Sequence, residues 1–360
     1  MIKKLILSGI ILFILLSIQQ VDACSTFCLK DSKSIVFGRS YDWNIGYGYM
    51  MTNLRNVKKT RFLPYDEKLT TWTSKYGSVT FNQYGKEYPI GGMNEMGLVI
   101  DVMTLKDTYY PNPDERSAID ELGWVQYQLD NSASIQDVIE SNITIRISNK
   151  TFVKLHFLVS DASGRTLAVE FLNGVATFHY DENLPYKCLT NSTYDNSLTY
   201  LSNHIGFGGE TPVDYQNHIS ANSLERFAIC ADMLNKYKED INTSIIDYSF
   251  DILNNVKDEV RSQFQIVYDL KNKEIHFRSL QSSNIKTVNL SSFDFDCTSK
   301  PMMIDVNTTF DGNIFNKFSQ YDSTANRELI IKAYRETGIK LPENIILKIA
   351  RWPENITCSQ

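Results

Sequence analysis

The chain of 360 residues has no excess of basic residues, few cysteines and, beyond its amino end, no long apolar run. Lys and Arg number 36 and Asp and Glu number 42, which gives a net charge of −6. This argues against nucleic acid as a partner, because phosphate backbones are bound by clusters of basic residues. Six cysteines do not demand a disulfide framework, and 42% apolar residues exclude a disordered chain.

Common metal-binding, nucleotide-binding and hydrolase motifs are also missing. The five histidines show no H-x-x-x-H spacing, and there is no C-x-x-C pair. The sequence contains no G-x-S-x-G elbow, Walker loop or G-x-G-x-x-G fingerprint. We therefore predict no metal and no organic cofactor. Because there is no internal repeat or low-complexity linker, we expect residues 24–360 to form a single domain.

The amino end predicts a secretory signal peptide over residues 1–23. Lys3 and Lys4 precede an almost purely apolar run from Leu5 to Ile18, and Val21 and Ala23 have the spacing of a cleavage site. The run is shorter than the about 20 residues that span a membrane. We expect cleavage after Ala23, no stable membrane anchor afterwards, and a secreted or periplasmic protein.

Cleavage there makes Cys24 the first residue, with a thiol and an α-amine on the same carbon. The two groups ionise near neutral pH, with pKa values of about 8.5 and about 7.7–8.0, so the amine can serve as the base for the thiol. This is the logic of N-terminal nucleophile hydrolases. Two other interpretations remain: Cys24 is a disulfide cysteine, or Val21–Cys24 is a lipoprotein signal whose lipid caps both groups.

The residues after Cys24 favour the catalytic interpretation. Residues 24–29 alternate like a strand, 30–33 read as a turn, and a second strand begins at Ile35. That strand carries Arg39 and leads to Asp42. A guanidinium near the sulfur favours thiolate, and a carboxylate near the α-amine orients it. The alternative is an ordinary ion pair at a strand end.

Five blocks in this order resemble the choloylglycine hydrolase family, which comprises bile salt hydrolases and penicillin V acylases. Each block is weak alone, but their shared order is specific and spans residues 24 to about 280. The blocks are Cys24 with Phe37–Trp43, Gly91–Leu98, Leu189–Ser192, Ser223–Phe227, and Val267–Leu270 with His276–Arg278.

The resemblance implies an α+β fold, an αββα sandwich of two stacked antiparallel sheets between helix layers. The sequence pattern is compatible with it. Leu155–Asp161 and Thr166–Phe171 read as strands, and Glu121–Ile139 and Leu224–Tyr237 show apolar residues at helical spacing. Arg226 would then lie in the first turn of its helix.

The resemblance also assigns six catalytic residues: Cys24, Arg39, Asp42, Asn94, Asn191 and Arg226. Cys24 attacks the acyl carbon, Arg39 stabilises the thiolate, and Asp42 holds the α-amine. Asn94 and Asn191 bind the oxyanion, and Arg226 braces them. Taken singly, Asn94 reads as a turn residue, Asn191 as a loop or glycan site, and Arg226 as a solvated helix position.

The implied function is hydrolysis of linear, non-peptide amides of small molecules, such as conjugated bile acids, penicillin V or other N-acyl amides. Acid ceramidase-like amidases use the same chemistry. The family often forms tetramers, which makes a homo-oligomer an expectation here. A secreted or lipid-anchored binding protein, with Cys24 structural or acylated, is the alternative from another class.

The sequence departs from the family pattern in three places. Arg55–Tyr88 and Tyr200–Ser220 lack its signatures, which leaves the choice of acyl group open. The tail beyond about Lys300 has no clear counterpart, and its stretch Asn326–Arg351 predicts a helix pair broken at Leu341-Pro342.

Overall fold

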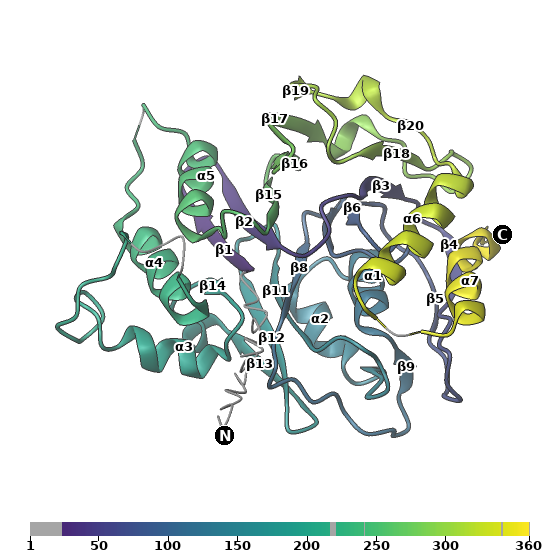
Figure 1. Cartoon of the computed structure of the whole chain (residues 1–360), viewed down its shortest axis with the longest axis horizontal. Coiled ribbons are helices and arrows are strands. Elements are labelled where there is room, and N and C mark those ends of the chain that lie inside the picture. The colour runs from purple at the N-terminus through teal and green to yellow at the C-terminus, as the bar shows by residue number, and fades with distance from the viewer. Residues whose placement is uncertain (1–23, 217–220, 241, 340, 360) are drawn as a thin grey trace, which may run out of the picture.

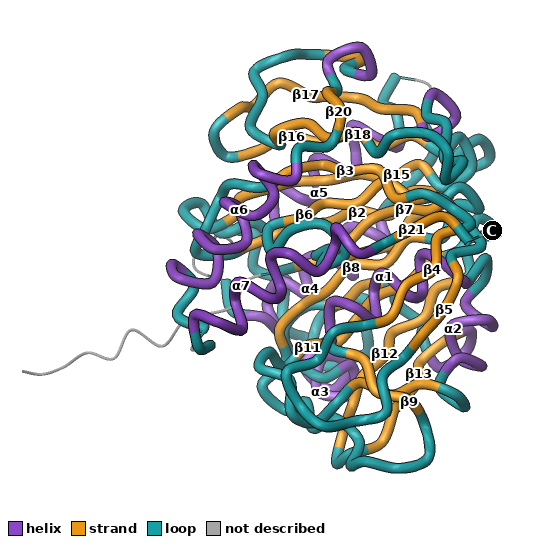
Figure 2. The backbone as a smooth tube through the Cα atoms, turned by 90° about the vertical axis from the view of Figure 1, so that its right-hand side faces the viewer, coloured by secondary structure: helices purple, strands orange, loops and turns teal. Residues whose placement is uncertain are grey.

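The computed structural model describes residues 24–359 apart from 217–220, 241 and 340, so the predicted signal peptide lies outside the described residues. Two large sheets lie against each other with helices on their outer sides (Figures 1 and 2). Helices α4 (Ser223–Lys236) and α5 (Ile245–Val256) pack on one sheet, and α1 (Glu121–Asn131) packs on the other. The predicted αββα layering is therefore confirmed.

The first sheet has seven strands and carries the amino end of the described chain. Its strands are antiparallel neighbours except for the last pair, which is parallel. In spatial order they are β14 (Cys188–Leu189), β1 (Ser25–Lys30), β2 (Ile35–Asp42), β15 (Ser262–Asp269), β16 (Glu274–Ser279), β17 (Ser282–Asn289) and β19 (Gly312–Asn313).

The second sheet has nine strands, all paired antiparallel. In spatial order they are β13 (Val175–Tyr180), β12 (Thr166–Leu172), β11 (Leu155–Ser160), β8 (Val99–Thr104), β7 (Gly91–Asn94), β6 (Ser78–Asn82), β3 (Tyr49–Asn53), β18 (Met302–Asp305) and β20 (Ser319–Gln320). The strands predicted at 155–161 and 166–171 are its β11 and β12.

Helices and two small sheets complete the fold, and no helix in the described ranges is long and apolar enough to cross a membrane. The helices are α1 (Glu121–Asn131), α2 (Ile135–Ser141), α3 (Tyr194–Leu201), α4 (Ser223–Lys236), α5 (Ile245–Val256), α6 (Ser323–Glu336) and α7 (Glu343–Arg351). The small sheets are β9 (Ser117–Ile119) with β10 (Ile145–Ile147), and β21 (Thr357–Cys358), β4 (Val57–Thr60) and β5 (Thr71–Thr73).

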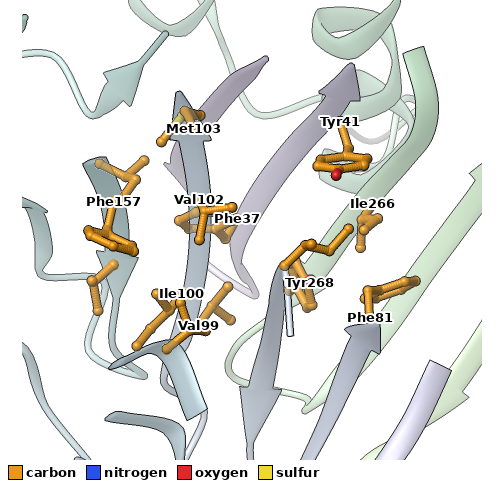
Figure 3. Packing of buried hydrophobic residues seen from close by; sticks show 14 of the residues in the cluster. Phe37, Tyr41, Phe81, Val99, Ile100, Val102, Met103, Phe157, Ile266 and Tyr268 are labelled. Atoms are coloured by element: carbon orange, nitrogen blue, oxygen red, sulfur yellow. The ribbon is translucent and has the colours of Figure 1, made fainter. Parts of the chain in front are cut away.

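The core lies between the two large sheets and is rich in aromatic rings (Figure 3). Phe81 on β6 meets Tyr268 and Phe277 of the opposite sheet edge to face, with ring centroids 6.3 Å and 5.3 Å apart. Phe27 on β1 faces Gly38 on β2, and a side chain at position 38 would occupy the space of the Phe27 ring. This packing fixes the two strands that carry the amino-terminal candidate residues.

The helical stretch predicted over Glu121–Ile139 is wrong as one element, because it folds as α1 and α2. The chain leaves the helix at Ser132, which is extended, and restarts at Ser134. Ser134 and Asp137 form a capping box, in which each side chain accepts from the other's backbone N–H. The apolar spacing continues across the break, so periodicity alone did not reveal it.

The tail forms the predicted helix pair, with Pro342 as the residue that starts α7. A disulfide between Cys297 and Cys358 and the pairing of β21 with β4 hold the tail against the body. Trp352 adds a hydrogen bond from its Nε1 to the carbonyl oxygen of Thr60, at 2.9 Å. The tail is therefore fixed in place at its far end.

Candidate active site

Cys24 immediately precedes β1, and its thiol lies beside the end of β2. The backbone N–H of Asp42 donates to Sγ over 3.5 Å, and Nη2 of Arg39 lies 3.9 Å from Sγ. The side chain is 4% exposed and forms no disulfide. An N–H donor and a guanidinium beside a sulfur both stabilise its anion. Cys24 therefore sits where a thiolate is favoured.

Arg39 links the thiol to the opposite sheet. Its guanidinium is fully buried, and Nη1 lies 3.1 Å from Oδ1 of Asp101 on β8. Burial by itself lowers the pKa of Arg39, but the negative charges of Asp101 and Cys24 outweigh it and raise that pKa. Arg39 is therefore a permanent cation next to Cys24.

The two carboxylate oxygens of Asp42 differ in their hydrogen bonding. Oδ1 accepts hydrogen bonds from Ser262 and from Ser40, the latter at 3.0 Å. Burial raises the pKa of Asp42 to about 7, against the opposing influence of the Arg226 charge and the two hydroxyls. Oδ2 is buried and has no hydrogen-bond partner among the described residues. The carboxyl group can thus accept from one more donor.

Asn191 is placed by the pairing of β14 with β1. Leu189 lies opposite Thr26 in this antiparallel ladder. β14 ends at Leu189, and Asn191 follows it outside the ladder. Its link to the site is Arg226, which donates to Asn191 and whose charge acts on Asp42.

The amide of Asn191 is held on both sides. Its Nδ2 lies 2.9 Å from both the carbonyl and the hydroxyl oxygen of Thr104, and its Oδ1 accepts from Nη2 of Arg226 at 3.2 Å. Arg226 is buried in the first turn of α4, as predicted, and also donates from Nη1 to the carbonyl of Ala221. A charged donor on Oδ1 fixes which end of the amide donates.

A buried carboxylate and two histidines support the residue before Asn191. Nε2 of His156 lies 2.6 Å from the carbonyl oxygen of Thr190, and its Nδ1 lies 3.3 Å from Glu170. His179 reaches the other oxygen of Glu170 at 3.2 Å. Burial alone would raise the pKa of Glu170, but the two histidines lower it to about 2. The cluster orients the turn that carries Asn191.

The structure does not support the predicted oxyanion role of Asn94. Its Nδ2 donates to the carbonyl oxygens of Leu129 and Ser132, at 2.9 Å and 2.8 Å, and its Oδ1 accepts from the backbone of Met96 and Leu98. Every hydrogen-bonding group of the amide is thus engaged by backbone near α1 and in the β7–β8 turn, and none of these partners belongs to the site around Cys24. Asn94 ties the β7–β8 turn to the carboxyl end of α1.

The other five predicted residues are brought together, along with three that sequence reasoning missed. The missed residues are Asp101, Thr104 and Ser262, which contact Arg39, Asn191 and Asp42 respectively. A signal existed for Asp101, which is an acid inside the otherwise apolar strand 99–103. Thr104 and Ser262 are ordinary strand residues, and only the fold gives them their neighbours.

A mostly apolar cavity opens beside Cys24. The cavity is lined by Cys24, Tyr41, Trp43, Tyr84, Ile90, Val102, Met103, Thr104, Glu121, Leu122, Phe152, Val153, Leu155, Tyr334 and Ile339.

Among the described residues, no group of His, Cys, Asp and Glu could hold a metal ion.

The bracing role of Asn94 predicts that Asn94→Ala lowers stability without altering the surroundings of Cys24. The substitution leaves buried backbone groups of α1 and of the β7–β8 turn unpaired, at about 1–3 kcal/mol for each such group. Urea unfolding should show this loss, while the alkylation rate of Cys24, read by peptide mapping, stays unchanged. Asn131→Ala, which removes one bond within α1 to the carbonyl of Tyr127, is the matched control. A changed alkylation rate with unchanged stability would restore Asn94 to the site.

Glu121 predicts a pH dependence of stability. Burial, helped by the charge of Asp120, raises the pKa of Glu121 to about 8 from 4.5. The folded state then binds this proton more tightly than the unfolded state, so stability falls as the pH rises between these values. Glu121→Gln should remove that part of the fall, measured as urea midpoints across this range. Parallel curves for both proteins would contradict the assignment.

Comparison with known proteins shows the family and the fold. A model of the linear amide C–N hydrolases, choloylglycine hydrolase family, matches residues 24–303. A penicillin V acylase from Pectobacterium atrosepticum is 26% identical over 261 residues, which cover 62% of this chain and 69% of the relative.

Two solved structures show the same fold. Penicillin V acylase from Agrobacterium tumefaciens aligns with a TM-score of 0.72 at 22% identity, over 83% of this chain and 98% of that one. A variant of conjugated bile acid hydrolase from Clostridium perfringens aligns with a TM-score of 0.63 at 18% identity, over 83% and 97%. Since the family model covers most of the sequence, the chain belongs to the choloylglycine hydrolase family of linear amide C–N hydrolases.

Proposed function

We propose that the protein is an exported hydrolase in which cleavage after Ala23 makes Cys24 the amino-terminal nucleophile for N-acyl amides. One observation carries this proposal. Oδ2 of Asp42 is buried with no hydrogen-bond partner among the described residues, next to a thiol that faces Arg39. Removal of residues 1–23 creates an α-amine on Cys24, the kind of donor that this oxygen lacks. The family match, which begins at Cys24, also supports it.

The first half of the reaction acylates the sulfur. The α-amine of Cys24 accepts the thiol proton while Sγ attacks the acyl carbon of the amide. Arg39 favours the thiolate by its charge, and Asp42 orients the resulting ammonium. Asn191 supplies an Nδ2–H to the oxyanion in place of one of its two hydrogen bonds to Thr104. The ammonium then protonates the leaving nitrogen, the C–N bond breaks, and a thioester and an amine remain.

The second half restores the enzyme. A water molecule attacks the thioester carbon and gives its proton to the α-amine, which acts again as general base. The C–S bond breaks, the sulfur recovers the proton, and a carboxylic acid leaves. Both halves use the same base and the same oxyanion donor, so no cofactor or second nucleophile is required. Because the signal peptide expected over residues 1–23 directs export, we also propose a secreted or periplasmic location.

The cavity supports a substrate with an apolar acyl group. Most of its lining side chains are aliphatic or aromatic, and Glu121 is its one carboxyl group. The names of the relatives indicate that they act on penicillin V and on conjugated bile acids. We infer that N-acyl amides are the substrates here, with the acyl group in the cavity and the amine directed away from it.

Replacement of the nucleophile tests the reaction directly. Cys24→Ser should abolish amide hydrolysis, because a hydroxyl is far less acidic than a thiol and the α-amine is too weak a base for it. Released amine is measured with purified mature protein, and circular dichroism checks that the variant folds. Activity close to that of the unmodified enzyme would show that the nucleophile lies elsewhere.

The state of the amino terminus provides the matched control. A protein that retains one Met before Cys24 keeps the thiol but turns the α-amine into an amide, so it should also be inactive. Intact mass confirms which form is present in each assay. Undiminished turnover by the extended form, or a diacylglycerol mass on active protein, would contradict the mechanism.

Asn191 lies in an N-x-S/T sequon, so a glycan and an oxyanion role exclude each other at this position. We expect Asn191 to be unmodified, and Asn191→Ala to lower kcat by about 10²–10³-fold, the cost of one oxyanion donor. Asn142→Ala, which removes another sequon asparagine, is the control and should leave turnover unchanged. A glycan on Asn191 in active enzyme, or full activity of Asn191→Ala, would remove this residue from the site.

A further inference from the structure

A second apolar cavity adjoins the one beside Cys24. It shares four lining residues with the first cavity: Glu121, Leu122, Phe152 and Tyr334. These four side chains form a partition between the two spaces. Beyond them the second cavity is lined by Phe62, Leu63, Pro64, Tyr65, Tyr88, Asp120, Thr151, Leu341 and Ile349.

The tail supplies walls to both cavities. Tyr334 of α6 and Ile339 line the first, and Leu341 and Ile349 of α7 line the second. All four lie beyond residue 303, where the family match ends. Figure 2 shows α6 and α7 side by side on the outside of the molecule. This chain therefore closes its pocket with a segment outside the part that defines the family.

The partition is compatible with passage of an apolar chain. Phe152 is 50% exposed, and its ring lies 6.1 Å from that of Tyr65, which lines the far cavity. A half-exposed ring can change rotamer without disrupting a core. Glu121 is the one carboxyl group of the partition, and burial raises its pKa, which keeps it uncharged near neutrality. An alkyl chain would thus meet no formal charge there.

We propose that the two cavities together bind one long, straight acyl chain, and that the tail sets the longest chain accepted. This inference rests on the proposed function, since it names the substrate class of the same site. The carbon atoms next to the scissile amide occupy the first cavity, and the distal methylenes pass Phe152 and end against Leu341 and Ile349. Short or bulky acyl groups occupy the first cavity alone.

A homologous series of acyl amides tests the proposal. The mature enzyme is assayed with butyryl, hexanoyl, octanoyl, decanoyl, dodecanoyl and palmitoyl amides of one common amine, and kcat/KM is plotted against chain length. Each further methylene buried in the transition state should raise kcat/KM by roughly fourfold. We expect the rise to continue past octanoyl and then to stop where the chain reaches Leu341 and Ile349.

The matched variants place Trp at two leucines of the tail. Leu341 lines the second cavity, whereas Leu347 on α7 is exposed and lines neither. Leu341→Trp should lower kcat/KM for the long amides by about 10-fold or more, because the indole takes space that the distal methylenes need. It should leave kcat/KM for the butyryl amide unaffected. Leu347→Trp should match the unmodified enzyme for every chain length. Ile349→Phe fills the same cavity from α7 and should repeat the result if Leu341→Trp fails to fold.

The outcomes separate the inference from the function on which it rests. Hydrolysis of short amides with no gain beyond octanoyl, or an equal loss on all amides in folded Leu341→Trp and Ile349→Phe, would overturn the two-cavity inference alone. Hydrolysis of none of the amides by mature enzyme with an intact Cys24 amine would overturn the proposed function as well.

Discussion

The ion pair between Arg39 and Asp101 joins the two sheets at the point where the candidate chemistry takes place. Both groups are buried, and their oxygen and nitrogen atoms lie 3.1 Å apart. Gly91, directly opposite Asp101 in the β7–β8 ladder, leaves the space that the carboxylate occupies, since a side chain at position 91 would overlap it. Loss of one partner would leave an uncompensated buried charge, which typically costs about 3–5 kcal/mol. The same pair holds the cation beside Cys24, so stability and thiol chemistry depend on one contact.

Alternation and helical spacing predicted single elements such as β1, β2, β11 and α4, whereas the sandwich that arranges them was implied by the family resemblance. The ordered blocks also supplied six candidate site residues, and the structure connects five of them in one cluster. Asn94 was misassigned because a Gly-Gly-Met-Asn turn looks the same whether its amide faces a ligand or a helix end. The partner of Asn191, Thr104, was not predictable, because their contact joins the end of a strand in one sheet to the segment after a strand in the other.

The tail, which lies beyond the family match, adds walls to the cavity beside Cys24. The predicted helix pair places apolar side chains beside Glu121 and Phe152. Tyr334 of α6 and Ile349 of α7 line the same cavity as these two residues. The Cys297–Cys358 disulfide and the small sheet of β21, β4 and β5 fix the tail to the body. A wall built outside the catalytic blocks can vary in shape without moving Cys24 or Arg39. Under the two-cavity proposal, the tail therefore limits the acyl chain, while the chemistry stays with the residues around Cys24.

The central claim is that Cys24, with its own α-amine as base, forms a thioester with the acyl group. The most direct test is to mix mature enzyme with a slowly hydrolysed N-acyl amide, quench in acid, and map the acyl adduct by mass spectrometry. The account predicts an acylated peptide that begins at Cys24 with a free amino terminus. An adduct on Cys28, or on a peptide that still carries residues before Cys24, would contradict it.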